Sequence, residues 1–251
     1  MLLPPSETKK SGGGNSRFKA DNLSFSAELT ETRKAVRAAL ETLSKNEDEA
    51  IKALKLGKKS ASEIGHNLTL HEQTTLPAID RYTGVLFDAI GLNEMDPASR
   101  QWINSNVYIQ SALFGLINAS DEIPAYRLSA SSRLPILTEP LKKTWIKAHS
   151  NIKIKQQLVL DLRSKEYASL APFADAYSLE VYTREADGSK KALNHFNKAA
   201  KGDLIKRMAQ SNVEFANITE LLLWSNSQKL DIVCEDKTLQ FVTNLGAPKR
   251  S

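Results

Sequence analysis

Apolar residues recur at helical spacing along much of the chain and predict several amphipathic helices. One face of residues 27–43 carries four of them, and this spacing predicts the first long helix: Leu29, Val36, Leu40 and Leu43. A second helix is expected over 77–90, because a proline suits a first helical turn and Gly91 suits a stop. Further helices are expected after Asp96-Pro97 and over 139–148, 164–170 and 196–210.

Short β-rich apolar runs alternate with these helices. The run 107–117 is almost entirely apolar and predicts one strand covered on both faces, in the middle of a sheet. Residues 1–3 predict a very short strand that ends at Pro4-Pro5, since proline has no donor for a ladder. Other strands are expected at 158–162 and 176–183, with a closing hairpin from 228–234 and 238–243.

The alternation of helices and strands runs through the whole chain, without a long linker or a fixed repeat. This order predicts a mixed α/β (α+β) fold, a single domain over 1–251 with a mixed central sheet flanked by helices. The last residues, 246–251, are expected to form a flexible basic tail.

Residues 44–68 carry two capping-box patterns, Ser44-x-x-Glu47 and Ser60-x-x-Glu63, which predict two short helices. The sequence LKLGKK over 54–59 lies between them. It resembles a helix-hairpin-helix, an element whose glycine turn presents backbone N–H groups to a DNA phosphate. Such hairpins usually carry two glycines, and only Gly57 is present here, so a plain helical hairpin with solvated lysines is an equal alternative.

The charge of the chain is only mildly positive, with 34 Lys and Arg against 29 Asp and Glu. Its placement matters more, because 140–155 holds five lysines and no acid, and 189–210 holds six basic residues against one acid. If these segments converge with the lysines of 52–59, they form one cationic face that binds phosphates and releases their counterions. Three separate solvated faces are the equal alternative.

Several classes of function are excluded or disfavoured by missing motifs. One cysteine, Cys234, allows neither an intramolecular disulfide nor a CxxC motif. The four histidines are scattered without ligand spacing, so exposed or capping histidines, no metal and no cofactor are expected, and iron sequestration is disfavoured. The run Gly12-Gly13-Gly14 lacks the GK[ST] of a P-loop, and Ser6-x-x-Lys9 lacks the partner motifs of penicillin-recognising enzymes.

The chain is expected to be cytoplasmic. No apolar run approaches a membrane span, and the first residues lack the basic and apolar regions of a signal peptide.

A loop after the predicted buried strand mixes a carboxylate, an aromatic ring and a guanidinium. Its Arg127 suits either of two roles, a bidentate clamp on a phosphate or, slightly favoured, a structural pairing with Asp121. If this loop meets the N-terminal segment, a hydroxyl, a carboxylate and an amine share one pocket, as in an enzyme acting on a nucleotide or nucleobase. The residues of that candidate pocket are Ser6, Glu7, Lys9, Tyr126 and Arg127.

An ordered set of short motifs resembles the YaaA family of bacterial peroxide stress proteins. The motifs are LPPSETK at 3–9, YTG at 82–84, SALFGLI at 111–117, and 121–128, which ends in YRL. The resemblance implies a mixed α/β domain of unusual topology with a helix-hairpin-helix and a positively charged cleft. It further implies binding to duplex DNA and a role in limiting oxidative DNA damage and free iron during hydrogen peroxide stress.

These observations predict a protein of the peroxide stress response that binds duplex DNA largely without sequence specificity. Double-stranded DNA is the expected partner, with no membrane contact and a monomeric state. A non-enzymatic role is favoured, and the nucleotide or nucleobase enzyme is the alternative. The residues expected to bind DNA are Lys55, Lys58, Lys59, Arg127, Lys142, Lys143, Lys198 and Lys201.

Overall fold

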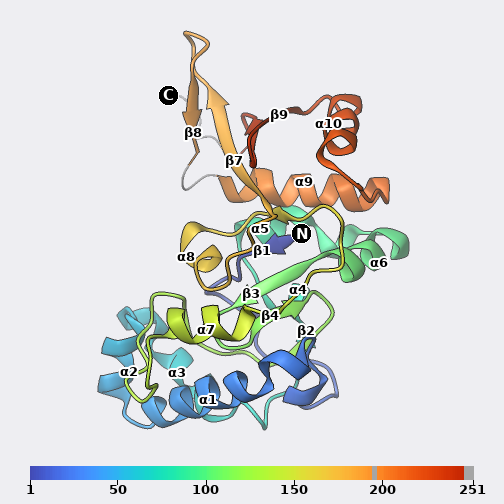
Figure 1. The fold of residues 1–251 in the computed structure, drawn as a ribbon. Helices are drawn as coiled ribbons and strands as arrows, with labels where there is room; N and C mark the ends of the chain where they lie inside the picture. The colour runs from blue at the N-terminus through green and yellow to red at the C-terminus, as the bar shows by residue number, and fades with distance from the viewer. Residues whose placement is uncertain (194–196, 246–251) are drawn as a thin grey trace.

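A mixed sheet connects the two halves of the molecule (Figure 1). The computed structural model describes residues 1–193 and 197–245. The strand order is β4-β3-β1-β6-β7-β10-β9, with β8 paired to β7. The strands are β1 (Leu2–Leu3), β3 (Tyr108–Ser111), β4 (Gly115–Asn118), β6 (Leu160–Asp161), β7 (Tyr177–Arg184), β8 (Lys190–Ala192), β9 (Asp231–Glu235) and β10 (Thr238–Val242). A separate pair joins β2 (Leu76–Pro77) to β5 (Glu122–Ile123).

Helices flank this sheet, so the predicted mixed α/β domain with a mixed central sheet is confirmed. In Figure 1, α1 to α3 and α7 lie in the lower half, and α9 and α10 lie in the upper half. The helices are α1 (Ser26–Ser44), α2 (Glu47–Leu54), α3 (Ile64–Leu68), α4 (Ala78–Arg81), α5 (Val85–Ile90), α6 (Pro97–Asn106), α7 (Leu141–His149), α8 (Lys165–Ala168), α9 (Asn197–Ser211) and α10 (Ile218–Ser227). Short 3-10 turns are η1 (Ala20–Asn22), η2 (Lys58–Glu63) and η3 (Leu92–Glu94).

Strand β1 is as short as predicted, yet it lies inside the sheet with parallel neighbours on both sides. It pairs with β3 and with β6, and both of its leucines are fully buried. The chain passes from β1 to β3 on one side and later returns to β6 on the other, so the strand order reverses at β1. In open α/β sheets, ligands bind at the carboxyl ends of the strands beside such a reversal. The segment after β1, residues 4–9, lies at this edge.

The predicted single strand over 107–117 is wrong, because the run folds into an antiparallel hairpin of β3 and β4. Ser111 makes the turn by accepting hydrogen bonds from the backbone N–H groups of Leu113 and Phe114. The turn is buried, so its apolar residues give no polar turn signal. His149, which contacts this hairpin, is also buried rather than exposed, and its Nε2 accepts a hydrogen bond from the Leu116 N–H.

Helix α1 confirms its predicted range, and its four predicted apolar residues are buried. The same buried face also holds Arg33, whose guanidinium donates to the carbonyls of Phe114, Leu116 and Ser24 at 2.7 to 2.9 Å. Burial lowers the pKa of Arg33 to about 10, still well above neutral. One charged side chain therefore joins α1 to the β3–β4 hairpin.

The predicted helix over 77–90 is interrupted. It forms as α4 and α5, and Tyr82 between them is extended and pairs with Lys9 in an antiparallel bridge. Gly84 has a positive φ of 98°, and the predicted stop at Gly91 is confirmed with a φ of 69°. Pairing with the N-terminal segment has therefore overridden the local helical pattern.

The helix-hairpin-helix is not confirmed. Helix α2 ends with Lys55 in the left-handed region at φ 55°, whereas Gly57 has an ordinary φ of −80°. The 3-10 turn η2 follows and leads into the short helix α3, so a short helix does lie on each side of 54–59. The first capping box does not form, because α2 is capped by the Asn46 side chain and Ser44 is the buried end of α1. The second does not form either, because the Ser60 hydroxyl donates to the Gly57 carbonyl and α3 has no side-chain cap.

The remaining predicted elements largely form near their expected positions. The helix after Asp96-Pro97, the strands near 158–162 and 176–183, and the closing hairpin are confirmed. Helix α10 was not predicted. The predicted tail 246–251 lies outside the described residues. Among the residues described, no helix combines the length and apolar character needed to cross a bilayer.

Substitution of Gly115 by alanine is expected to destabilise the fold. Gly115 has a φ of 67°, and a Cβ there would lie 2.7 Å from the Trp145 ring. A left-handed non-glycine residue alone costs about 1–3 kcal/mol, and the clash adds to it. Urea unfolding should show this loss for Gly115→Ala and little change for Gly57→Ala, whose Cβ would meet nothing within 4 Å. Equal stabilities of the two variants would contradict the assigned turn.

Candidate functional site

The structure brings together all five residues of the predicted pocket, at the carboxyl end of β1. The segment 4–9 lies against Tyr82 and Arg127, which come from the α4–α5 connection and the loop after β5. Lys9 bridges to Tyr82 through the backbone, and Arg127 Nη2 lies 2.8 Å from the Glu7 carboxylate. We keep the name N-terminal pocket, taken from the sequence prediction, for the cluster of Ser6, Glu7, Lys9, Tyr126 and Arg127.

Lys9 occupies the centre of the N-terminal pocket. Its Nζ lies 4.2 Å from the centre of the Tyr126 ring and 5.4 Å from that of Tyr82. It donates to the carbonyls of Ser6 and Glu7, each at 3.1 Å. Burial, with a smaller effect of the Arg127 charge, lowers the pKa of Lys9 to about 7. Near neutral pH the amine is therefore present in both its charged and its neutral form.

A chain of hydroxyl groups runs behind Lys9. Ser111 Oγ accepts from two backbone N–H groups, which occupy both of its lone pairs. Its own proton therefore goes to the Tyr126 hydroxyl at 2.8 Å, and Tyr126 donates in turn to Tyr82 at 2.8 Å. Burial raises the pKa of both tyrosines, so both remain protonated at neutral pH. The Tyr82 hydroxyl is the last in this series of hydrogen bonds, so its own proton remains to be donated.

The predicted pairing of Arg127 with Asp121 is wrong. Asp121 accepts hydrogen bonds from the Ser24 N–H and hydroxyl and from the Asn118 N–H, at 2.8 to 3.0 Å. Arg127 is buried and pairs with two carboxylates, those of Glu7 and Glu63. Glu7 and Glu63 lie in segments far from Arg127 in the chain, so no local signal in the sequence indicates this pairing.

Residues 44–68, whose sequence resembles a helix-hairpin-helix, contact the loop that carries Arg127. Glu63 pairs with the Arg127 guanidinium at 3.2 Å. The amide of Asn67 binds both backbone groups of Arg127, accepting from its N–H at 2.7 Å and donating to its carbonyl at 3.0 Å. This segment therefore holds the loop that carries Tyr126 and Arg127.

Three hydroxyls line the more exposed part of the site. Ser6 Oγ lies 3.2 Å from Thr8 Oγ1, and Thr83 donates to Thr8 at 2.9 Å. A Cβ on Gly84 would lie 3.4 Å from Ser6 Oγ, so a glycine suits this close approach as well as its positive φ. The prediction from sequence missed Tyr82, Thr83 and Ser111 as pocket residues, although two of the family-like motifs contain them.

The rejected glycine run 12–14 is a structural loop. Arg81 is fully buried and donates to the carbonyls of Lys10, Gly12, Thr74 and Ile123 at 2.6 to 3.1 Å. Four backbone carbonyls thus converge on one guanidinium, which fixes the segment following the pocket.

The residues expected to bind DNA lie on separate elements. Lys142 and Lys143 are exposed at the start of α7, Lys55 is exposed at the end of α2, and Lys198 is exposed on α9. Helix α7 packs on α1, whereas α9 packs on α5 and α6, and Figure 1 shows α2 and α9 far apart. The side chains of Lys58 and Lys59 lie outside the described residues.

Lys201 is not a surface residue. It is buried on α9 and donates to the Leu162 carbonyl at 2.9 Å. Burial lowers its pKa to about 8. Its ammonium therefore serves the packing of α9 against the chain after β6.

A hollow of about 480 Å³ lies beside the C-terminal end of α2. Three cationic residues line it, Lys52, Lys55 and Arg133, against one acid, Glu49. The Arg133 N–H donates to the Ala53 carbonyl at 2.9 Å, which fixes the two segments to each other. We call Lys52, Lys55 and Arg133 the basic hollow.

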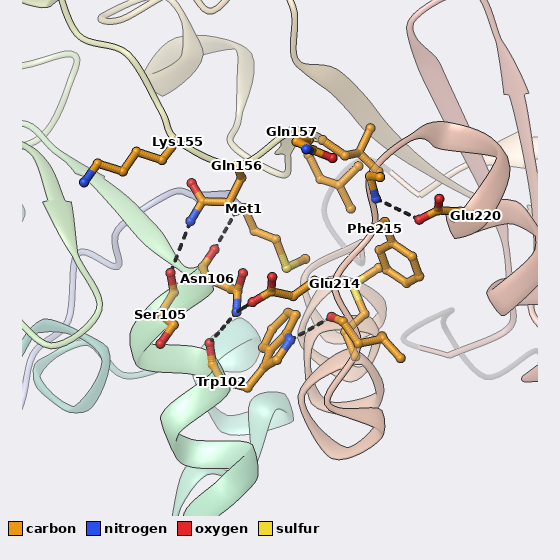
Figure 2. Close-up of a pocket in the computed structure, with 15 residues that line it drawn as sticks. Met1, Trp102, Ser105, Asn106, Lys155, Gln156, Gln157, Glu214, Phe215 and Glu220 are labelled. Carbon is orange, nitrogen blue, oxygen red and sulfur yellow. Dashed lines mark hydrogen bonds between the residues drawn. The ribbon is translucent and has the colours of Figure 1, made fainter.

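A further cavity of about 540 Å³ lies at the opposite, amino end of β1 (Figure 2). The buried Met1 amino group donates to the Asn106 carbonyl at 2.6 Å, and burial lowers its pKa to about 5. Asn106 also donates to Glu214, and Trp102 donates to the Val213 carbonyl. These bonds join α6 to the segment before α10. None of the residues predicted for a site lines this cavity.

The described residues contain no group of three His, Cys, Asp or Glu side chains placed to hold a metal ion. The N-terminal pocket and its neighbours present an amine, hydroxyls, two carboxylates and a guanidinium.

The sheet is mixed, and a cluster of polar side chains lies at the carboxyl end of β1, where the strand order reverses. This is the place where open α/β folds bind ligands, so the class is an α/β protein with a polar cluster at that place. The family model described as peroxide stress protein YaaA matches residues 1–230, and the chain belongs to this family.

Three relatives cover most of the chain. A UPF0246 protein of Corynebacterium glutamicum is 38% identical over 240 residues, 94% of each chain. A UPF0246 protein of Corynebacterium efficiens is 36% identical, covering 88% of this chain and 89% of its own. A UPF0246 protein of Streptomyces coelicolor is 33% identical, covering 83% and 82%. The family resemblance drawn from the ordered motifs is therefore confirmed.

The lowered pKa of Lys9 predicts a specific pH dependence of stability. In the unfolded chain this amine has a pKa of 10.5, so between about pH 7 and 10.5 the unfolded state binds more protons than the folded state. Stability from Lys9 therefore rises with pH across this window, and the buried charge costs stability below pH 7. Chemical unfolding of wild type and Lys9→Met from pH 6 to 10 gives the free energy of unfolding of each. The wild-type value minus the Lys9→Met value should rise as the pH increases through this window.

The neighbouring exposed lysine provides the matched control. Lys10→Met should shift stability by a similar amount at each pH, because its side chain is not enclosed by the two tyrosines. A wild-type minus Lys9→Met difference that stays constant with pH would contradict the assigned burial of the amine.

Proposed function

We propose that this protein of the peroxide stress family is a cytoplasmic monomer that binds duplex DNA through its phosphates, largely without sequence specificity. By occupying DNA it would limit oxidative DNA damage, and the proposal includes a role in limiting free iron. The family supports the setting of peroxide stress. The basic hollow supports the binding mode.

The basic hollow is the observation that carries this proposal. Its three cations and single acid create a net positive concavity, in contrast to the N-terminal pocket, where Arg127 is held by two carboxylates. A DNA phosphate placed there replaces condensed counterions, which favours binding by the entropy of their release. The exposed Lys142 and Lys143 would extend the contact from the start of α7. Lys201 takes no part, because its ammonium is bound inside the protein.

Fluorescence anisotropy of a labelled duplex across a salt series tests this proposal. Binding should weaken log-linearly with salt, with a slope of about −0.9 for each phosphate contact. The triple variant Lys52→Ala, Lys55→Ala and Arg133→Ala should weaken binding to all duplex sequences alike. Its slope should become shallower by about 2.7, since three contacts are removed.

A charge removed elsewhere provides the control. Lys198→Ala lowers the net charge by one on the distant helix α9 and should leave the salt slope nearly unchanged. Equal effects of the Lys198 change and of Lys55→Ala alone would indicate general attraction rather than a site. Absence of binding at low salt would overturn the proposal.

A second candidate function is favoured by the N-terminal pocket. A half-buried amine near neutrality, beside hydroxyl donors and carboxylates, exceeds what phosphate binding requires and suits an enzyme acting on a nucleotide or nucleobase. Incubation with nucleotides and with damaged duplex DNA should then give turnover that Lys9→Met abolishes and Lys10→Met retains. Equal product formation by wild type and Lys9→Met would contradict this candidate.

A further inference from the structure

The Lys9 amine is placed for covalent chemistry with a carbonyl group. We propose that Lys9 forms an imine with the open-chain aldehyde of a sugar, whose uncharged aldehyde end the N-terminal pocket holds. This inference rests on the second candidate function, an enzymatic pocket, and is independent of duplex binding in the basic hollow.

The surroundings of Lys9 match those of nucleophilic lysines. Such amines are activated by burial or by a neighbouring cation, and Lys9 has both, since it lies against two tyrosine rings and close to Arg127. With its pKa lowered to about 7, about half of the amine is neutral at pH 7. An exposed lysine of pKa about 10.4 has only roughly one part in 2,500 neutral at that pH.

The groups around the amine favour a neutral, hydroxyl-rich ligand. Both guanidiniums that act on Lys9 are already bound, that of Arg127 by the Glu7 and Glu63 carboxylates and that of Arg81 by four carbonyls. This arrangement disfavours an aldehyde that itself carries a carboxylate or phosphate beside the reacting carbon. Carboxylate oxygens and the hydroxyls of Ser6 and Thr8 are suitable partners for the hydroxyl groups of a sugar.

The proposed step balances without any oxidant or reductant. The neutral Nζ of Lys9 attacks the aldehyde carbon, the C–N bond forms, and the π pair of the carbonyl moves to oxygen, which takes a proton. Nitrogen then loses a proton, and the hydroxyl group is protonated and leaves as water while the nitrogen lone pair forms the C=N bond. The iminium nitrogen then loses its remaining proton, which balances the proton taken up by the leaving hydroxyl. One amine and one aldehyde thus give one imine and one water. Solvent at the exposed edge of the site, beside Thr8, supplies and takes up these protons.

The same sugar aldehyde has two possible sources, a free aldose or the deoxyribose left in DNA where a base is missing. The test therefore uses two probes, free 2-deoxyribose and a short duplex with one abasic site. Each is incubated with the full-length protein and treated with sodium borohydride, which adds hydride to the imine carbon and leaves a stable secondary amine. Peptide mass spectrometry then gives the labelled lysine.

Lys9 should be labelled at least about tenfold more than Lys10 in the wild-type protein at pH 7, and this ratio should fall toward pH 10 as ordinary lysines become neutral. The comparison within one folded chain does not depend on the stability of a variant. Lys9→Arg should lose the selective label, and Lys10→Arg should keep it. Labelling by either probe supports the imine and identifies its source.

Labels spread evenly over the exposed lysines, or no label from either probe, would overturn the inference. Anisotropy with an intact duplex separates this failure from that of the DNA proposal, because Lys9→Arg leaves the basic hollow unchanged. Turnover assays separate it from the enzymatic candidate, since the label requires only imine formation.

Discussion

Burial of the first three residues between two parallel strands is the constraint on which the rest of the structure depends. Leu2 and Leu3 are fully buried, and their backbone carries the pairing to β3 on one side and β6 on the other. A two-residue strand contributes few ladder hydrogen bonds, so its place is secured by apolar burial. Because β1 is fixed, the next residues must leave the sheet at its carboxyl edge, where the N-terminal pocket forms.

Two buried arginines bind backbone carbonyls that helices and strands leave without a partner. Arg33 binds carbonyls of the β3–β4 hairpin, and Arg81 gathers four carbonyls from three separate segments. A planar guanidinium has five donors in fixed directions, which suits irregular backbone that no ladder can satisfy. The loops around the site are therefore held by charged side chains, at positions that sequence periodicity treats as surface.

The N-terminal pocket and the basic hollow differ in their electrostatics, and the two proposals follow from that difference. In the hollow the cations outnumber the acid and suit a phosphate. In the pocket the Arg127 guanidinium is bound by two carboxylates, and burial is the main cause of the lowered pKa of the Lys9 amine. The element that resembles a DNA-binding hairpin adjoins both, since Lys55 lines the hollow and Glu63 and Asn67 hold the loop of Arg127.

The sequence by itself determined the class of fold, the family and most of the regular elements, because helical spacing, β-rich runs and ordered motifs are local signals. It also named five residues that the fold brings together, although it missed Tyr82, Thr83 and Ser111 beside them. It could not determine that 107–117 turns back on itself, that Tyr82 interrupts a helix, or that Arg127 chooses Glu7 and Glu63 over Asp121. The first is a buried turn whose apolar residues give no polar turn signal. Only the tertiary structure decided the other two, because Tyr82 and Arg127 pair with partners far away in the chain whose contact free energy exceeds the local preference.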